Sequence, residues 1–120
     1  MRPLTILLVE DEPVIALDLR MALEQHGHRV ICAHDAGEAL AFSARYLPDV
    51  AILNFLMQHN MDGMELAQLL RTRFLVRVLM VTGSRWEDME ASAQFYAGTE
   101  VLYKPFTRRQ LKECLEDIVK

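Results

Sequence analysis

Short apolar runs alternate with longer amphipathic stretches along the chain, and this pair of patterns repeats five times. The first run, residues 5–9, is almost wholly apolar, as is typical of a strand buried on both faces of a parallel sheet. Four comparable runs rich in β-branched residues follow it. The pattern predicts strands at 5–9, 29–33, 50–53, 76–81 and 100–103.

Between these runs lie residues that are typical of the starts and ends of helices. Pro13 suits the first turn of a helix, and Gly27 suits the residue just beyond its end. Asp35 and Asp62 are good N-cap residues, and Pro48 limits the helix before it. We expect helices at 13–25, from Asp35 to before Pro48, from Asp62 to about Arg71, from about Glu87, and from about Thr107, the last burying Leu111, Leu115 and Ile118.

This order of elements predicts an α/β fold of the (βα)5 type. Parallel strands joined by right-handed helical crossovers give a doubly wound five-stranded sheet with helices on both faces. The 120 residues fit one domain, 1–120, without a linker or an internal repeat. In such a fold, ligands bind at the carboxyl ends of the strands.

Composition narrows the class of protein. Hydrophobic residues make up 52% and charged residues 25%, as in globular domains, and the net charge of −4 argues against a nucleic-acid groove. No apolar run approaches the roughly 20 residues that cross a bilayer, so we expect a soluble, cytoplasmic protein. Two distant cysteines, Cys32 and Cys114, are expected to be reduced thiols.

Polar residues follow four of the five predicted strands. Glu10 and Asp11 follow the first strand, Asn54 the third, Thr82 the fourth and Lys104 the fifth. Carboxylates are ligands for Mg²⁺, while a hydroxyl and an ammonium group stabilise a phosphoryl group. The set fits phosphoryl transfer, except that the amide of Asn54 is no nucleophile where a carboxylate would form an acyl phosphate.

At this point the chain resembles a response-regulator receiver domain of bacterial two-component signalling. The resemblance rests on the motifs ILLVEDEP (6–13), PDVAILN (48–54), MDGMEL (61–66), MVTG (80–83) and YKPF (103–106), which occur in the family's order. It implies a flavodoxin-like sheet with strand order 2-1-3-4-5. It also implies a Mg²⁺ site made by Glu10, Asp11 and the backbone carbonyl of Leu56, with Asn54 at the phosphoacceptor position.

The resemblance assigns the remaining positions as well. Thr82 is the switch hydroxyl and Lys104 contacts phosphate, while the adjacent Pro105 favours a cis turn that aims the lysine inward. Trp86 lies near the face made by the helix from about Glu87, the fifth strand and the last helix. The implied partners are a sensor histidine kinase, a phosphotransfer protein or an output partner, bound through that face or through the first helix. A homodimer through the same face is an open alternative.

Three departures from the family pattern set expectations for this chain. Asn54 replaces the acceptor aspartate, so we expect no acyl phosphate there and weak or absent Mg²⁺ binding. The loop 55–60 is one residue longer than usual and lacks the customary proline after Met57. Val101 stands where typical members carry an aromatic switch residue. Asn54 has two open origins, a natural pseudo-receiver or an engineered Asp→Asn change.

The four histidines, His26, His28, His34 and His59, form no ligand set and are expected to be solvated loop residues.

Three classes of function stay open from the sequence. The first is a signalling module that switches its surface and is not an enzyme. The second is a haloacid-dehalogenase-like phosphatase, which would need a second aspartate two residues after its nucleophile; Asp11 is followed by Glu12 and Pro13. The third is a pure interaction domain with a receiver fold, which a lack of Mg²⁺ response would reveal.

Overall fold

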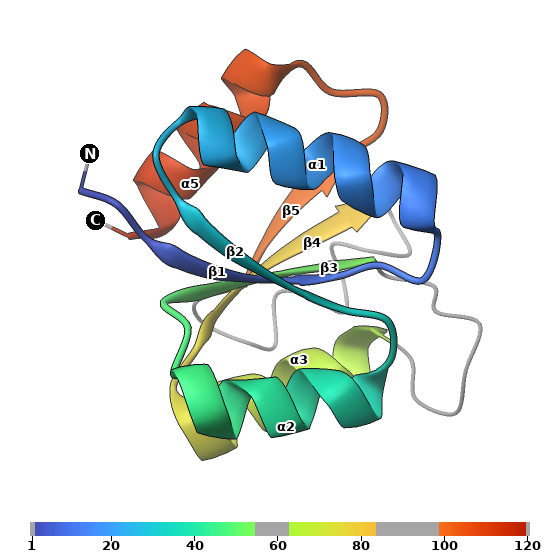
Figure 1. Ribbon diagram of the computed structural model, residues 1–120, viewed down its shortest axis with the longest axis vertical. Coiled ribbons are helices and arrows are strands. Elements are labelled where there is room, and N and C mark those ends of the chain that lie inside the picture. The colour runs from blue at the N-terminus through green and yellow to red at the C-terminus, as the bar shows by residue number, and fades with distance from the viewer. Residues whose placement is uncertain (1, 55–62, 84–98, 120) are drawn as a thin grey trace.

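The computed structural model describes residues 2–54, 63–83 and 99–119. Its five strands form one parallel sheet, as the sequence pattern predicted, in the order β2-β1-β3-β4-β5 that the family resemblance implied (Figure 1). The elements are β1 (Thr5–Val9), α1 (Pro13–Gln25), β2 (Arg29–Ala33), α2 (Ala36–Tyr46), β3 (Val50–Asn54), α3 (Gly63–Phe74), β4 (Arg77–Thr82), β5 (Thr99–Tyr103) and α5 (Arg108–Ile118).

The predicted boundaries are close to the observed ones. The largest difference is at α3, which continues to Phe74 and not to about Arg71. The helix expected from about Glu87 and the cap expected at Asp62 lie outside the described residues.

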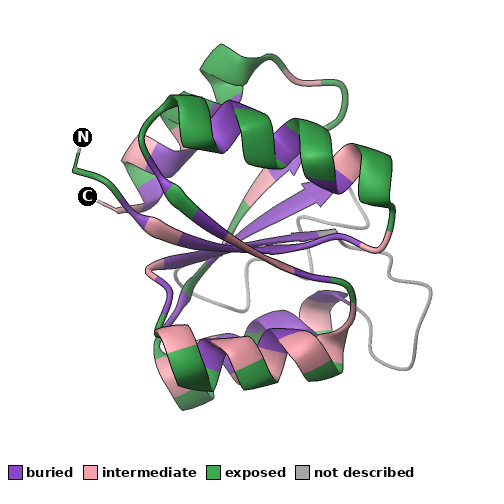
Figure 2. Ribbon diagram, viewed as in Figure 1, coloured by how far each residue is buried: buried purple, intermediate pink, exposed green. Residues whose placement is uncertain are grey.

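Helices cover both faces of the sheet, with α1 and α5 on one side and α2 and α3 on the other (Figure 1). Successive residues of β1 serve the two faces in turn, because side chains alternate along a strand. Ile6 and Leu8 pack into the first core cluster with residues of α1 and α5, whereas Leu7 and Val9 pack into the second with residues of α2 and α3. The buried positions therefore form two cores separated by the sheet (Figure 2).

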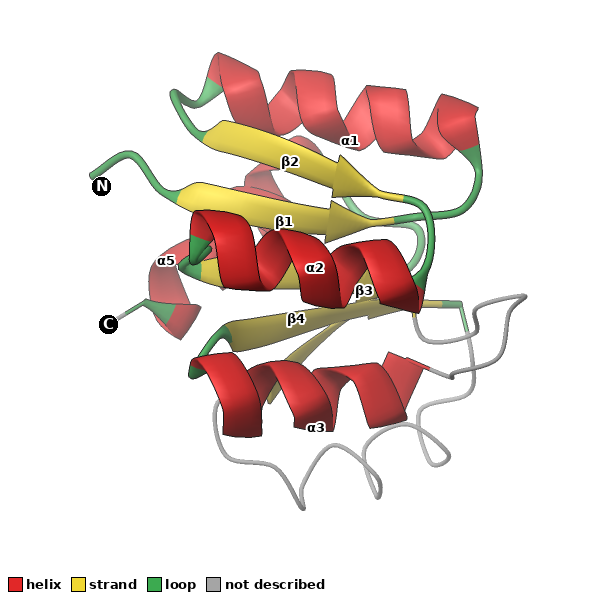
Figure 3. Cartoon of the chain, turned by 60° about the horizontal axis from the view of Figure 1, so that its bottom comes forward, coloured by secondary structure: helices red, strands yellow, loops and turns green. Residues whose placement is uncertain are grey.

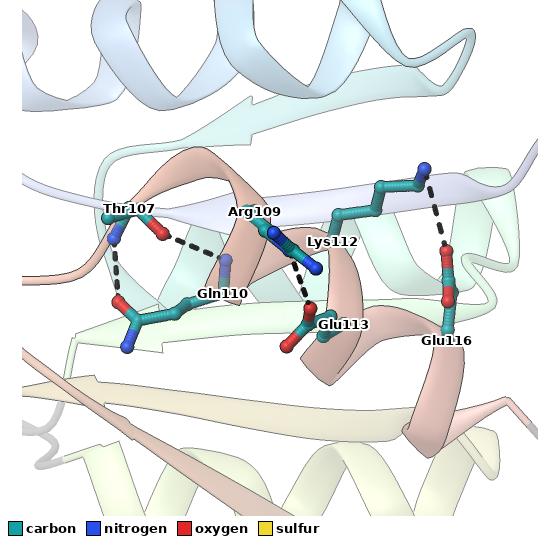
Figure 4. Close-up of polar contacts among 6 residues, drawn as sticks. All are labelled: Thr107, Arg109, Gln110, Lys112, Glu113 and Glu116. Carbon is teal, nitrogen blue, oxygen red and sulfur yellow. Dashed lines mark hydrogen bonds and ion pairs between the residues drawn. The ribbon is translucent and has the colours of Figure 1, made fainter.

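Local capping residues decide where two of the described helices, α2 and α5, begin. The carboxylate of Asp35 accepts a hydrogen bond from the Glu38 amide at 2.8 Å at the start of α2. Thr107 and Gln110 form a reciprocal capping box at the start of α5 (Figure 4). As predicted, α5 buries Leu111, Leu115 and Ile118.

One histidine prediction is wrong. His28 is only 6% exposed, and its Nδ1 accepts a hydrogen bond from the Leu4 N–H at 3.0 Å. The ring lies in the turn before β2, where it satisfies a backbone donor just before β1. His26 and His34 are exposed as expected, and His59 lies outside the described residues.

Both cysteines are free thiols that pack, half-buried, against the first core cluster. Burial raises the pKa of each thiol. Within the described part of the chain, no helix is long and apolar enough to span a membrane.

Candidate functional site

The carboxyl ends of the strands share one edge of the sheet, because all five strands run parallel (Figure 3). Glu10 directly follows β1, Asn54 ends β3, Thr82 ends β4 and Lys104 directly follows β5. Asn54 pairs in register with Val81. The side chain of Asn54, like the whole of Leu56 and Trp86, lies outside what the structure describes.

Glu10 is a carboxylate withdrawn from water. It is 4% exposed, and its backbone N–H donates to the Ala33 carbonyl at 3.1 Å, which fixes it between β1 and β2. Its Oε1 accepts the Glu12 N–H at 3.2 Å. Burial raises the pKa of Glu10, an effect that the Glu12 amide and the charge of Lys104 oppose and the neighbouring Asp11 reinforces. A cation placed here would relieve the repulsion between the two acids.

Lys104 is held next to the end of β4 by its backbone. Its N–H donates to the Thr82 carbonyl at 2.8 Å, and the Lys104–Pro105 peptide bond is cis. The Thr82 side chain is 2% exposed, while Lys104 is exposed yet close enough to Glu10 to lower the pKa of that carboxyl. A hydroxyl and an ammonium group thus flank the edge that ends in the two acids.

A cavity of about 340 Å³ opens beside this edge, between α1 and the chain that follows β5. It is lined by Ile15, Asp18, Leu19, Lys104, Pro105 and Phe106. Asp18 did not emerge from the sequence as a site residue, since a single acid on a helix carries no signal of its own. Its position between the inward-facing Ile15 and Leu19 was the available hint.

Val101 is half-buried and packs against the second core cluster. It lies three residues before Lys104 and reaches the sheet face that α2 and α3 cover. The position expected to hold an aromatic switch residue is thus filled by a small aliphatic side chain.

The described residues include no group of three or more His, Cys, Asp or Glu side chains arranged to hold a metal ion. Glu10 and Asp11 supply two carboxylates. Mg²⁺ is commonly bound by one or two carboxylates together with waters and other oxygens, so this donor set is compatible with that ion.

Taken together, the fold and this edge define a flavodoxin-like α/β domain with an acidic pair after the first strand and a lysine–cis-proline step after the last. The sequence model of one protein family, the response regulator receiver domain, matches residues 6–116. The chain belongs to this family, the receiver domains of two-component systems.

Two similar proteins, both transcriptional regulatory proteins, agree with this assignment. The chain is 31% identical over 107 residues to the probable transcriptional regulatory protein TcrX of Mycobacterium tuberculosis, covering 88% of the chain and 45% of the relative. It is 29% identical over 119 residues to the transcriptional regulatory protein TrcR of the same organism, covering 98% and 46%. The chain thus spans about half the length of these relatives.

Solved structures show the same fold. The chemotaxis protein CheY4 of Vibrio cholerae superposes with a TM-score of 0.87 at 25% identity, covering 98% of this chain and 99% of that one. NtrX of Brucella abortus gives a TM-score of 0.87 at 26% identity, covering 98% of this chain and 27% of NtrX.

Membership of the family supports the signalling class among the three that the sequence left open. Receiver domains are generally non-enzymatic signalling domains. They interact with histidine kinases or phosphotransfer proteins and with output domains, and they typically bind Mg²⁺ at the phosphorylation site.

Proposed function

We propose that this chain is a receiver domain whose signalling does not use an acyl phosphate at position 54. The observation that supports this is the edge itself. Glu10, Asp11, Thr82 and Lys104 gather around the end of β3, and the residue that ends β3 is Asn54. The edge has the groups that stabilise a phosphoryl group but an amide where the nucleophile belongs.

The roles of the surrounding residues follow from their chemistry. Glu10 and Asp11, with the Leu56 carbonyl, are the ligands for Mg²⁺, which would supply charge stabilisation when bound. Thr82 donates a hydrogen bond to a phosphoryl oxygen, and Lys104 neutralises its charge. Because Asn54 carries no charge, the site has one negative charge fewer than a site with aspartate, and its attraction for a divalent cation is correspondingly weaker.

Signalling by this domain therefore depends on its protein contacts. A sensor histidine kinase, a phosphotransfer protein or an output partner binds through α1 or through the face around β5 and α5, with Trp86 as a candidate contact residue, and a homodimer through that face is the alternative arrangement. Val101 in place of an aromatic residue removes the usual coupling between Thr82 and that face. We place the protein in the cytoplasm, where such partners act, with residues 1–120 working as one domain.

Phosphorylation of the reverted site tests this proposal. The protein and its Asn54→Asp variant are incubated with Mg²⁺ and acetyl phosphate, and their masses are then measured by intact-mass spectrometry. We expect no phosphoryl adduct on the protein and one adduct on Asn54→Asp, with loss of that adduct in Asn54→Asp/Lys104→Ala.

The other outcomes are equally informative. An adduct on the unaltered protein contradicts the proposal, or reveals a second acceptor that peptide mapping would locate. No adduct on either protein means that the rest of the edge is also inactive, and the domain is then a pure interaction module.

A further inference from the structure

The helices α2 and α3 end in leucines with an unfavourable backbone. Leu47 follows α2 with φ 49° and Leu75 follows α3 with φ 56°, both in the left-handed region, where glycine or asparagine is usual. By contrast, α1 is followed by Gly27 with φ 89°. The two leucines are also 70% and 85% exposed, so burial does not explain them. The conformation itself is the usual helix cap, with hydrogen bonds from Leu47 N–H to the Ser43 carbonyl and from Leu75 N–H to the Arg71 carbonyl. What the fold leaves unexplained is an exposed leucine at each of these caps.

Arginines surround the two leucines at the amino edge of the sheet, opposite the candidate site. Backbone hydrogen bonds join the starts of the neighbouring strands along this edge. The Arg29 N–H donates to the Leu4 carbonyl at 2.9 Å, the Asp49 N–H to the Thr5 carbonyl at 2.8 Å, and the Arg77 N–H to the Asp49 carbonyl at 3.4 Å. The side chain of Arg2 pairs with Asp49 at 3.5 Å.

A second pair of arginines lies next to Leu47. The guanidinium groups of Arg29 and Arg45 each lie 5.3 Å from the centre of the Tyr46 ring, so the tyrosine holds both cations at the end of α2. Both arginines are exposed. We call the set Arg2, Arg29, Arg45, Leu47, Leu75 and Arg77 the arginine–leucine surface.

The surface includes a hollow. A cavity of about 240 Å³ is lined by Arg2, Pro48, Asp49, Leu75, Arg77 and Val119. Arg2 is paired with Asp49, and the Arg77 side chain donates to the Ile118 carbonyl, so the cations offered to a partner are chiefly Arg29 and Arg45 beside Leu47. The acids that follow the strands, Glu10 and Asp11 among them, lie at the other edge (Figure 3 shows the two edges at opposite ends of the sheet).

We propose that the arginine–leucine surface binds an acidic amphipathic segment of a partner protein. All its cations are arginines, whose planar guanidinium groups bind carboxylates in a bidentate manner. The exposed leucines need apolar partner atoms, which a protein side chain offers and a phosphate backbone does not. Arginine and aromatic residues such as Tyr46 are enriched in protein interfaces, where lysine is depleted. The surface lies apart from the candidate site, so the inference does not depend on Asn54.

The test uses a fluorescein-labelled synthetic peptide that alternates glutamate and leucine with helical spacing. A peptide with lysine in place of glutamate and a single-stranded DNA oligonucleotide are the comparison probes. Fluorescence anisotropy measures affinity, and ¹⁵N amide shifts locate the binding site. We expect saturable binding of the acidic peptide alone, with shifts at Arg29, Leu47, Leu75 and Arg77.

Variants separate the surface from general charge. Leu47→Asn/Leu75→Asn removes the apolar contacts with a residue that tolerates the left-handed backbone, so the fold is retained, and affinity should fall about tenfold. Arg29→Gln/Arg45→Gln should weaken binding to a similar extent. Leu17→Asn changes an exposed leucine on α1 and should leave affinity unchanged.

Five outcomes would overturn the proposal, of which the first four concern the binding experiment. These four are an absence of saturable binding, shifts confined to the carboxyl edge, affinity indifferent to the leucine variants, and binding of DNA at least as tight as that of the peptide. Self-association of the protein that the leucine variants abolish would identify a second copy as the occupant and would also overturn it.

Discussion

At the scale of single residues, burial of a polar side chain changes its pKa and so links its protonation to folding. His28 is the clearest case, because its Nδ1 must be unprotonated to accept the Leu4 N–H. Burial, reinforced by the nearby His26, lowers the pKa of His28 below the ordinary value of 6.5. The neutral ring is therefore part of the folded structure.

The free energy of unfolding therefore depends on pH. In the unfolded chain His28 takes up its proton near pH 6.5, whereas the folded protein resists protonation until a lower pH. The unfolded state then binds more protons, so the free energy of unfolding is fully retained above about pH 6.5 and falls as the pH drops toward the lowered pKa. We expect His28→Asn, whose Oδ1 can accept the same bond, to lose less stability in acid than the unaltered protein does.

Urea unfolding at about pH 7.5 and about pH 5.5, on the two sides of the ordinary histidine pKa, measures this difference. His34→Asn is the matched control, since His34 is exposed and does not contribute to the lowered pKa of His28, and it should keep the acid dependence of the unaltered protein. An equal acid dependence in His28→Asn would show that the buried ring does not titrate with folding.

At the scale of elements, the residues at helix ends should contribute more to the free energy of unfolding than the surface ion pairs do. Leu75 holds a left-handed backbone while leaving 85% of its surface in water, so little apolar burial offsets the unfavourable conformation. Leu75→Asn should raise the free energy of unfolding by about 1 kcal/mol, because asparagine adopts this conformation more readily.

Chemical denaturation of Leu75→Asn beside Leu17→Asn checks this expectation. Leu17 is also exposed, but it lies inside α1, where asparagine is a poorer helix former than leucine. Stabilisation by the first change and slight destabilisation by the second would support the explanation. Loss of stability in both would mean that Leu75 makes a packing contribution after all.

The capping box of α5 offers a comparison of magnitudes (Figure 4). The Thr107 hydroxyl accepts the Gln110 N–H at 3.1 Å, and the Gln110 side chain accepts the Thr107 N–H at 2.8 Å. On the same helix, Arg109 pairs with Glu113 at 3.1 Å on the exposed side. Thr107→Ala should cost about 1 kcal/mol, as N-cap losses do, whereas Arg109→Ala should cost less than about 0.5 kcal/mol.

Thermal unfolding of the two variants under one buffer condition is the measurement. Since surface pairs are screened by salt, any effect of Arg109→Ala should shrink further at high ionic strength, while that of Thr107→Ala should persist. A larger loss from Arg109→Ala would assign α5 a tertiary contact through that arginine.

At the scale of the whole molecule, the sheet order sets a gradient of stability. β3 is central, with β1 and β4 beside it and β2 and β5 at the edges. Amides of central, fully buried residues should exchange with solvent only on global unfolding, and edge strands should open at lower free energy. We expect Ile52 and Leu79 to exchange most slowly and Cys32 and Leu102 faster.

Native-state hydrogen exchange by NMR at increasing denaturant tests this gradient. Leu66→Ala, which removes a buried side chain of α3, should lower protection at Ile52 by the same amount as it lowers the global free energy of unfolding. Equal protection of edge and central strands would indicate that the sheet opens only as one unit.

The sequence by itself determined the order and type of the elements and the residues that end each strand. Those properties are local: the alternation of apolar runs, the caps at Asp35 and Thr107, and the turn at Gly27 are written in neighbouring residues. The carboxyl edge with Glu10 and Lys104 followed, because parallel strands bring their ends together once the order of elements is known.

Only the tertiary structure decided the rest, and the reason is distance along the chain. Leu4 and His28 are 24 residues apart, and no periodicity reports that their atoms meet. In the same way, Asp18 reaches the cavity beside Lys104, and arginines scattered in sequence gather around Leu47 and Leu75. Each depends on which helix crosses which strand, a choice made by packing the whole core.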